Sequence, residues 1–218
     1  MADVELHDEV VDWLATLSDA EWERVAVIVD RLADLGSQAR MPLSRSLGDG
    51  LFELRFSLGP TARRITYRFT MDGRIIMLTT FRKQRQNERK RDRSSTQGRC
   101  RVRTALPVKE ETMANYSRWS EIKGKRPAPS AETRAGIEQD LALGQLIYDL
   151  RTEAGLSQRE LAERMGTTQS VISRLEEGGG ARNRIDTLAR VATALNRHLV
   201  VSFPEELPAD LKDAVQVA

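Results

Sequence analysis

The sequence predicts two domains of different fold class. The first is an α+β domain with two helices packed on a small antiparallel sheet, and the second is all-α. Apolar residues recur every three or four positions between residues 6 and 35, as on one face of a helix. In three segments between 51 and 81 they alternate with polar residues, as in half-buried strands. Helical periodicity then returns between 131 and 196, where it is most regular.

The first periodic segment divides into two amphipathic helices. The division falls at Ser18-Asp19, where Ser18 is a suitable N-cap for the second helix. Gly36 follows the last apolar position, Leu35, and ends the helix pair. The order predicted for the first domain is therefore helix, helix and then sheet.

Three strands are predicted after the turn at residues 47–50. In the first two strands, large apolar residues occupy every second position, which directs the intervening polar residues to the other face of the sheet. The signal Met71-Asp72-Gly73 is typical of a hairpin and precedes a third, more apolar strand. The polar face should therefore be open to solvent and should carry Arg55, Arg64 and Arg68 together.

Such a basic face, with no carboxylate pair, histidine or metal cage, favours RNA cleavage by the substrate's own 2′-hydroxyl. The protein then needs only to orient the backbone and to neutralise the pentacoordinate phosphate, which guanidinium groups do well. Arg82 and Lys83 follow the third strand and add two cations at its rim. Ordinary surface charge remains the alternative interpretation.

The patterns GDGLFELRF, RRITYRF and DGRIIMLTTFRKQRQ resemble the RelE/ParE superfamily of toxins, closest to its Gp49-like and HigB-type members. The resemblance covers about residues 4–89 and implies a metal-independent endoribonuclease that cleaves mRNA on the ribosome. It implies that Arg55, Arg64, Arg82 and Lys83 form the basic active-site set. Arg68 is added from the alternation alone.

Two other functions stay open for this domain. ParE-like inhibition of gyrase uses the same scaffold, so the scaffold does not separate it from RNA cleavage. Members of the superfamily also continue from the FRK element into a C-terminal helix, which is missing here. A catalytically inert interaction module is therefore the second alternative. Tyr67 is assigned to the core rather than to base stacking.

Residues 82–103 carry 10 basic and 2 acidic residues, a density typical of a linker or of a nucleic-acid contact. Residues 88–112 have no apolar periodicity, so a basic, disordered linker is predicted over 90–130, within which residues 116–122 could form one short helix. Within it KEETMANYS, 109–117, resembles the beginning of another protein, with a start at Met113. One hypothesis is a frame slip near 88–90 that joined two adjacent reading frames, and the alternative is a selected linker.

The segment LSQRELAERMGTTQSVISRLEEG, 156–178, contains the strongest motif in the chain. Ser157 and Glu160 form a Ser-x-x-Glu capping box, and Gly166 makes the turn between two helices. The motif resembles the Cro/C1-type helix-turn-helix of repressors and of HigA-like antitoxins, over about residues 137–203. The resemblance implies operator DNA as a partner and a recognition helix over 168–177.

By this resemblance, Gln169 would read an adenine edge, whereas Gln158 and Ser173 would contact phosphates. The full set of predicted DNA-binding residues is Gln158, Thr168, Gln169, Ser170, Ser173 and Arg174. A helix is predicted over 185–195. A strand over 198–203 is predicted to pair across a homodimer.

The function predicted from both halves is that of a fused type II toxin-antitoxin protein. A toxin domain, 1–89, is neutralised by a DNA-binding domain, 131–203, which autoregulates its operon and precedes a tail, 204–218. The two halves would associate through residues 116–122. The absence of a signal peptide and of a run of about 18 apolar residues predicts a cytoplasmic protein without membrane contact. With one cysteine and two distant histidines, no metal and no cofactor are expected.

Overall fold

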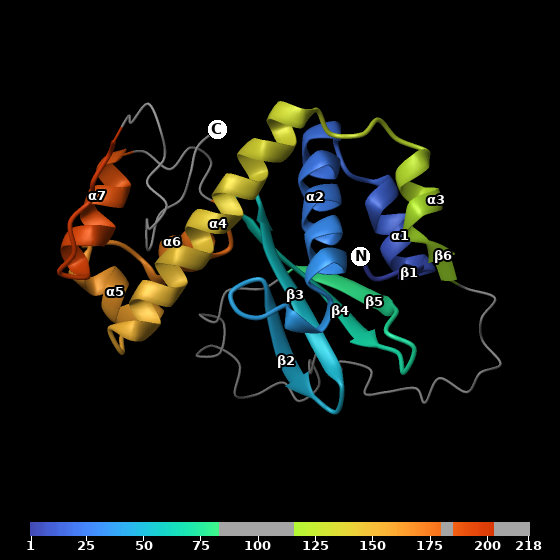
Figure 1. The fold of residues 1–218 in the computed structure, drawn as a ribbon, viewed down its shortest axis with the longest axis horizontal. Helices are drawn as coiled ribbons and strands as arrows, with labels where there is room; N and C mark the ends of the chain where they lie inside the picture. Colours follow the sequence, from blue (N-terminus) through green and yellow to red (C-terminus); the bar gives the residue numbers. More distant parts are fainter. Residues whose placement is uncertain (83–115, 180–184, 203–218) are drawn as a thin grey trace, which may run out of the picture.

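The computed structural model describes residues 1–82, 116–179 and 185–202 (Figure 1). The strands are β1 Val4–His7, β2 Ser44–Gly48, β3 Leu51–Leu58, β4 Thr61–Phe69, β5 Ile75–Arg82 and β6 Tyr116–Arg118. The helices are α1 Asp8–Ala15, α2 Asp19–Leu35, α3 Trp119–Gly124, α4 Ala131–Glu153, α5 Gln158–Arg164, α6 Gln169–Glu176 and α7 Ile185–Ala194, with a short 3-10 helix at Gly36–Gln38. Figure 1 shows α1 and α2 beside the sheet, and α4 running from them to the other helices.

The predicted helix pair is confirmed, including its boundary. The hydroxyl of Ser18 accepts a hydrogen bond from the Glu21 amide, and the Glu21 carboxylate accepts one from the Ser18 amide at 3.1 Å. This reciprocal capping satisfies two amide groups that a helix leaves without partners. Gly36 ends the helix with a φ of 51°, in the region that favours glycine.

The predicted strands β3, β4 and β5 form an antiparallel meander, but the sheet is mixed rather than purely antiparallel. Its order is β2-β3-β4-β5-β1-β6, and β1 pairs parallel with β5. β1 has only four residues and leads directly into α1. Such a short segment does not display a clear alternation, which is why β1 was not predicted from the sequence. Tyr67 is fully buried, as predicted, and its hydroxyl lies 2.5 Å from Ser44 Oγ.

The segment after residue 115 differs from the predicted linker. β6 pairs antiparallel with β1, and α3 follows it immediately. Trp119 is buried and donates a hydrogen bond of 2.9 Å to Asp30 of α2. The prediction of disorder is therefore wrong for 116–124, and the short helix considered for 116–122 is present as α3, preceded by a strand instead of extending to residue 116. This segment gains its structure from contacts with a distant part of the chain. Residues 90–115, with the proposed start at Met113, lie outside the described residues.

The second unit contains the predicted helix-turn-helix. Ser157 and Glu160 form the expected capping box, and Gly166 has a φ of 60° in the turn between α5 and α6. Its core consists of Ile147, Leu161, Ala162, Met165, Ile172, Leu175, Val191 and Leu195. The other half of α4 belongs to the sheet unit, because Ile137 and Leu141 share its buried cluster.

The strand predicted over 198–203 is not present in the described part, 198–202, where Val200 and Val201 are exposed. A strand requires a partner for its backbone groups, and the described residues provide none there. Across the described ranges, no helix is both long and apolar enough to cross a membrane.

Candidate functional site

Two of the predicted arginines, Arg55 and Arg64, lie side by side on one face of the sheet. They are direct cross-strand partners on β3 and β4, so their side chains point to the same face. The expectation that this face is open to solvent is wrong at these positions, because Arg55 is only 7% exposed and Arg64 only 1%. The residues that cover them belong to the second unit.

The group that covers the arginine pair is the carboxylate of Glu177, the C-cap residue of α6. Arg64 Nη2 donates to Glu177 Oε1 at 2.7 Å, and Arg55 Nη2 donates to the same oxygen at 3.4 Å. Two hydroxyls complete the shell, since Ser57 Oγ donates to Glu177 Oε2 at 2.9 Å and Ser173 Oγ to Oε1 at 3.1 Å. A buried carboxylate is tolerated because it is paired and fully hydrogen-bonded.

Glu53 supports the pair from within β3. Its Oε1 lies 3.4 Å from Arg64 Nε and 3.5 Å from Arg55 Nε. Burial lowers the pKa of Arg55 because it disfavours the charged form, and the neighbouring Arg64 charge lowers it further, while Glu177 and Glu53 act in the opposite direction. Arg55 nevertheless remains a cation at neutral pH, because a guanidinium keeps its proton in proteins.

The other predicted active-site cations do not join this pair. Arg68 shares the face but lies four residues further along β4, about 13 Å away at the usual rise per residue. Arg82 pairs with Arg63, whereas Phe81 pairs with Arg64. The side chain of Arg82 therefore lies on the opposite face of the sheet from that of Arg64. Lys83 lies outside the described residues.

Four neighbours of the arginine pair were not assigned to the site from the sequence. Glu53 and Ser57 occupy the same alternating positions as Arg55, so the two-residue period was a signal for both. Phe81 is recognised only through its register opposite Arg64. For Glu177 the sequence contains no such signal, because its contacts depend on how the two units pack.

The predicted DNA-binding residues divide into two groups. Thr168, Gln169 and Ser170 are exposed at the beginning of α6, where Gln169 Nε2 donates to Gln158 Oε1 at 2.6 Å. Arg174 is half-buried, and its Nε contacts the Ser170 carbonyl oxygen at 3.4 Å. Ser173 is 6% exposed and bonds Glu177, so the phosphate contact predicted for it is wrong. Its hydroxyl is turned toward Glu177, which bonds the arginines of the sheet unit.

Comparison with known families separates the same two units. Residues 12–99 match the family model described as Phage derived protein Gp49-like (DUF891), and residues 147–201 match the model described as Helix-turn-helix. The chain joins a Gp49-like domain to a helix-turn-helix domain. No curated protein matches the chain, and no solved structure does. The helix-turn-helix domain implies DNA binding.

The two domains meet at the turn that follows α6. Gly179 packs so tightly on the Gp49-like domain that an added Cβ would lie 2.6 Å from the Ser57 Cβ. Arg24 of α2 donates to the carbonyl oxygens of Ser57, at 3.0 Å, and of Gly178. Gly178 has a φ of 65°, which ends the helix and turns the chain over the sheet. These backbone contacts fix the position of Glu177 over the arginine pair.

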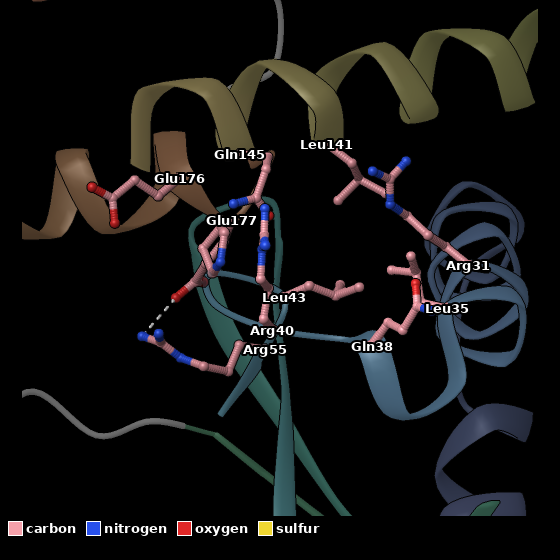
Figure 2. Close-up of a pocket in the computed structure, with 11 residues that line it drawn as sticks. Arg31, Leu35, Gln38, Arg40, Leu43, Arg55, Leu141, Gln145, Glu176 and Glu177 are labelled. Atoms are coloured by element: carbon pink, nitrogen blue, oxygen red, sulfur yellow. Dashed lines mark hydrogen bonds and ion pairs between the residues drawn. The ribbon is translucent and has the colours of Figure 1, made fainter. Parts of the chain in front are cut away.

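A cavity of about 570 Å³ opens beside this contact, between the loop before β2 and the helices α2 and α4 (Figure 2). Its lining residues are Arg31, Leu35, Gln38, Arg40, Pro42, Leu43, Arg55, Leu141, Gln145, Glu176 and Glu177. Both domains therefore contribute to its walls. Among the described residues, no group of three histidine, cysteine or acidic side chains is arranged to hold a metal ion.

Proposed function

We propose that this chain is a fused type II toxin-antitoxin protein. In this proposal the Gp49-like domain is an mRNA-interferase-like toxin, and the helix-turn-helix domain neutralises it and represses the operon that encodes both. The observation that supports it is the contact of Glu177 with Arg55 and Arg64. Both arginines belong to the basic set that the toxin resemblance implies, and the carboxylate comes from the DNA-binding domain.

The carboxylate of Glu177 occupies the place that a scissile phosphate would take. Guanidinium groups bind carboxylates and phosphates through the same charge-assisted hydrogen bonds. In the cleavage reaction the 2′-hydroxyl of RNA attacks the adjacent phosphorus and the 5′-oxygen leaves, while Arg55 and Arg64 neutralise the negative charge that accumulates. RNA must therefore displace Glu177 before this reaction begins.

The connection between the domains favours the blocked state. Residues 116–134 attach the helix-turn-helix domain to α2, since Trp119, Lys123 and Arg134 all bond the carboxylate of Asp30. A covalent tether also raises the effective concentration of one domain near the other to about the millimolar range. We therefore expect the intact chain to show little free nuclease activity.

Growth of bacteria that express the intact chain tests this proposal. Glu177→Ala should expose the arginine pair and arrest growth, with cleavage of translated mRNA detected by primer extension. Adding Arg64→Ala to the same chain should restore growth. Glu163→Ala removes an exposed carboxylate from the same domain and serves as the matched control. A Glu177→Ala chain that folds, binds DNA and leaves both growth and mRNA intact would refute neutralisation by Glu177.

A second candidate is a transcriptional repressor whose Gp49-like domain is an inert interaction module. The near-complete burial of Arg64 favours it, because a permanently covered side chain cannot contact substrate. Under this function, Glu177→Ala would weaken the contact between the domains without toxicity. Repression of a reporter placed behind the operator would persist in both cases, so the growth assay separates the two functions.

A further inference from the structure

The cavity between the two domains carries an excess of positive charge. Three cations line it: Arg31 from α2, Arg40 from the loop before β2, and Arg55 from β3. Figure 2 shows the guanidinium groups of Arg31 and Arg40 directed toward α4, on the cavity side of the helix. Neither of these two guanidinium groups has a hydrogen bond or ion pair within the described part of the chain, whereas Arg55 is ion-paired with Glu53 and Glu177.

Two carboxylates also line the cavity, but both are paired with arginines other than Arg31 and Arg40. Glu176 forms an ion pair with Arg151, at 2.5 Å, and accepts a further bond from Gln158. Glu177 forms its shortest bond with Arg64. Neither carboxylate is therefore free to cancel the charges of Arg31 and Arg40, and the potential inside the cavity remains positive.

The remaining wall of the cavity is apolar. Leu35, Pro42, Leu43 and Leu141 contribute to it, beside the amide groups of Gln38 and Gln145. A volume of about 570 Å³ lies within the range of small-molecule sites, which combine an apolar wall with a few convergent polar groups. Free guanidinium groups favour phosphate among common small anions because they match its oxygens in pairs.

We propose that this cavity binds a small phosphate-bearing molecule of about mononucleotide size, held by Arg31 and Arg40 and resting on the leucine wall. The site is distinct from the contact between Glu177 and Arg64, although Arg55 borders both. Binding does not require the Gp49-like domain to cleave RNA, so the two proposals succeed or fail separately.

Calorimetric titration of the intact chain tests this site. The probes are inorganic phosphate, adenosine 5′-monophosphate and adenosine, which has no phosphate. Arg31→Gln and Arg40→Gln should each weaken binding of the monophosphate, and the double variant should weaken it about tenfold or more, since charged hydrogen bonds are lost. Arg159→Gln is the matched control, because Arg159 is 82% exposed on the other domain.

The probes also distinguish a nucleotide from free inorganic phosphate as the ligand of this cavity. Tighter binding of the nucleotide than of inorganic phosphate supports a contact between the base and the leucine wall, whereas equal binding supports a site for the phosphate group alone. Adenosine should bind to neither the wild type nor the variants. The proposal is overturned if no phosphate-bearing probe binds, or if the double variant binds as tightly as the Arg159→Gln control.

Discussion

Glu177 Oε1 lies 2.7 Å from Arg64 Nη2, although the two residues are separated by 113 positions in the chain and belong to different domains. Both side chains are only 1% exposed. An ion pair removed from water in this way is costly to break from one side, because the remaining charge is left without a partner. This pair therefore couples the position of the helix-turn-helix domain to the state of the arginine face.

Removing one partner of this pair should destabilise the protein strongly. Arg64→Ala leaves Glu177 buried without its closest cation, and we expect a loss of about 3–5 kcal/mol in the free energy of unfolding. The double variant Arg64→Met/Glu177→Leu removes both charges and should be more stable than Arg64→Ala. Urea denaturation followed by circular dichroism measures both values. A double variant less stable than the single one would contradict this account of the pair.

The close contact between α4 and α6 depends on Gly144. A Cβ at this position would lie 2.5 Å from the Glu176 carbonyl oxygen, which is backbone and has little freedom to move. Gly144→Ala should therefore lower stability by about 1–3 kcal/mol. Gly136→Ala on the same helix meets no atom within 4 Å and should raise stability by up to about 1 kcal/mol through helix propensity. Opposite shifts of the melting temperature in the two variants check this prediction.

The attachment of residues 116–134 should depend on pH through Asp30. Burial favours the neutral carboxyl, but hydrogen bonds from Trp119, Lys123 and Arg134 outweigh it and lower the pKa of Asp30 below the ordinary value of 3.8. A lowered pKa in the folded state contributes stability above pH 3.8, and this stability is lost as the pH falls through the folded value.

Hydrogen exchange measures this attachment directly. Protection of the amides of β6 and α3 should decrease when the pH is lowered below about 4 in the wild type. In Asp30→Asn, protection should already be reduced at neutral pH and should change little with acidification. An Asp30→Asn chain as well protected as the wild type at pH 7 would show that the carboxylate does not hold this segment.

The recognition helix should read DNA through its exposed end only. With an operator selected from a pool of random duplexes, Gln169→Ala should weaken specific binding by about 1–3 kcal/mol, the value of one bidentate base contact. Ser173→Ala should leave operator affinity unchanged, because Ser173 is buried against Glu177. Electrophoretic mobility shifts at a fixed salt concentration compare the two variants, and equal losses would contradict the assignment.

Helices and strands were predictable from the sequence where the residues that define them lie within a few positions of one another. Ser157 was recognised as a helix cap because its partner Glu160 lies three residues away, and Ser18 because serine suits an N-cap position before a periodic apolar segment. The alternation around Arg55 and Arg64 likewise predicted that both side chains share one face. The same alternation wrongly grouped Arg68 with this pair. Residues that share a face of a strand can still lie far apart along it.

The sequence by itself determined the two domain types, the helix-turn-helix and the common face of Arg55 and Arg64, because periodicity and capping act over a few residues. Only the tertiary structure decided that this face is covered, that β6 extends the sheet, and that Glu177 rather than solvent meets the arginines. Those features depend on contacts between positions about a hundred residues apart. Such contacts are stabilised by burial of both segments together, so neither segment shows a sequence pattern that predicts them.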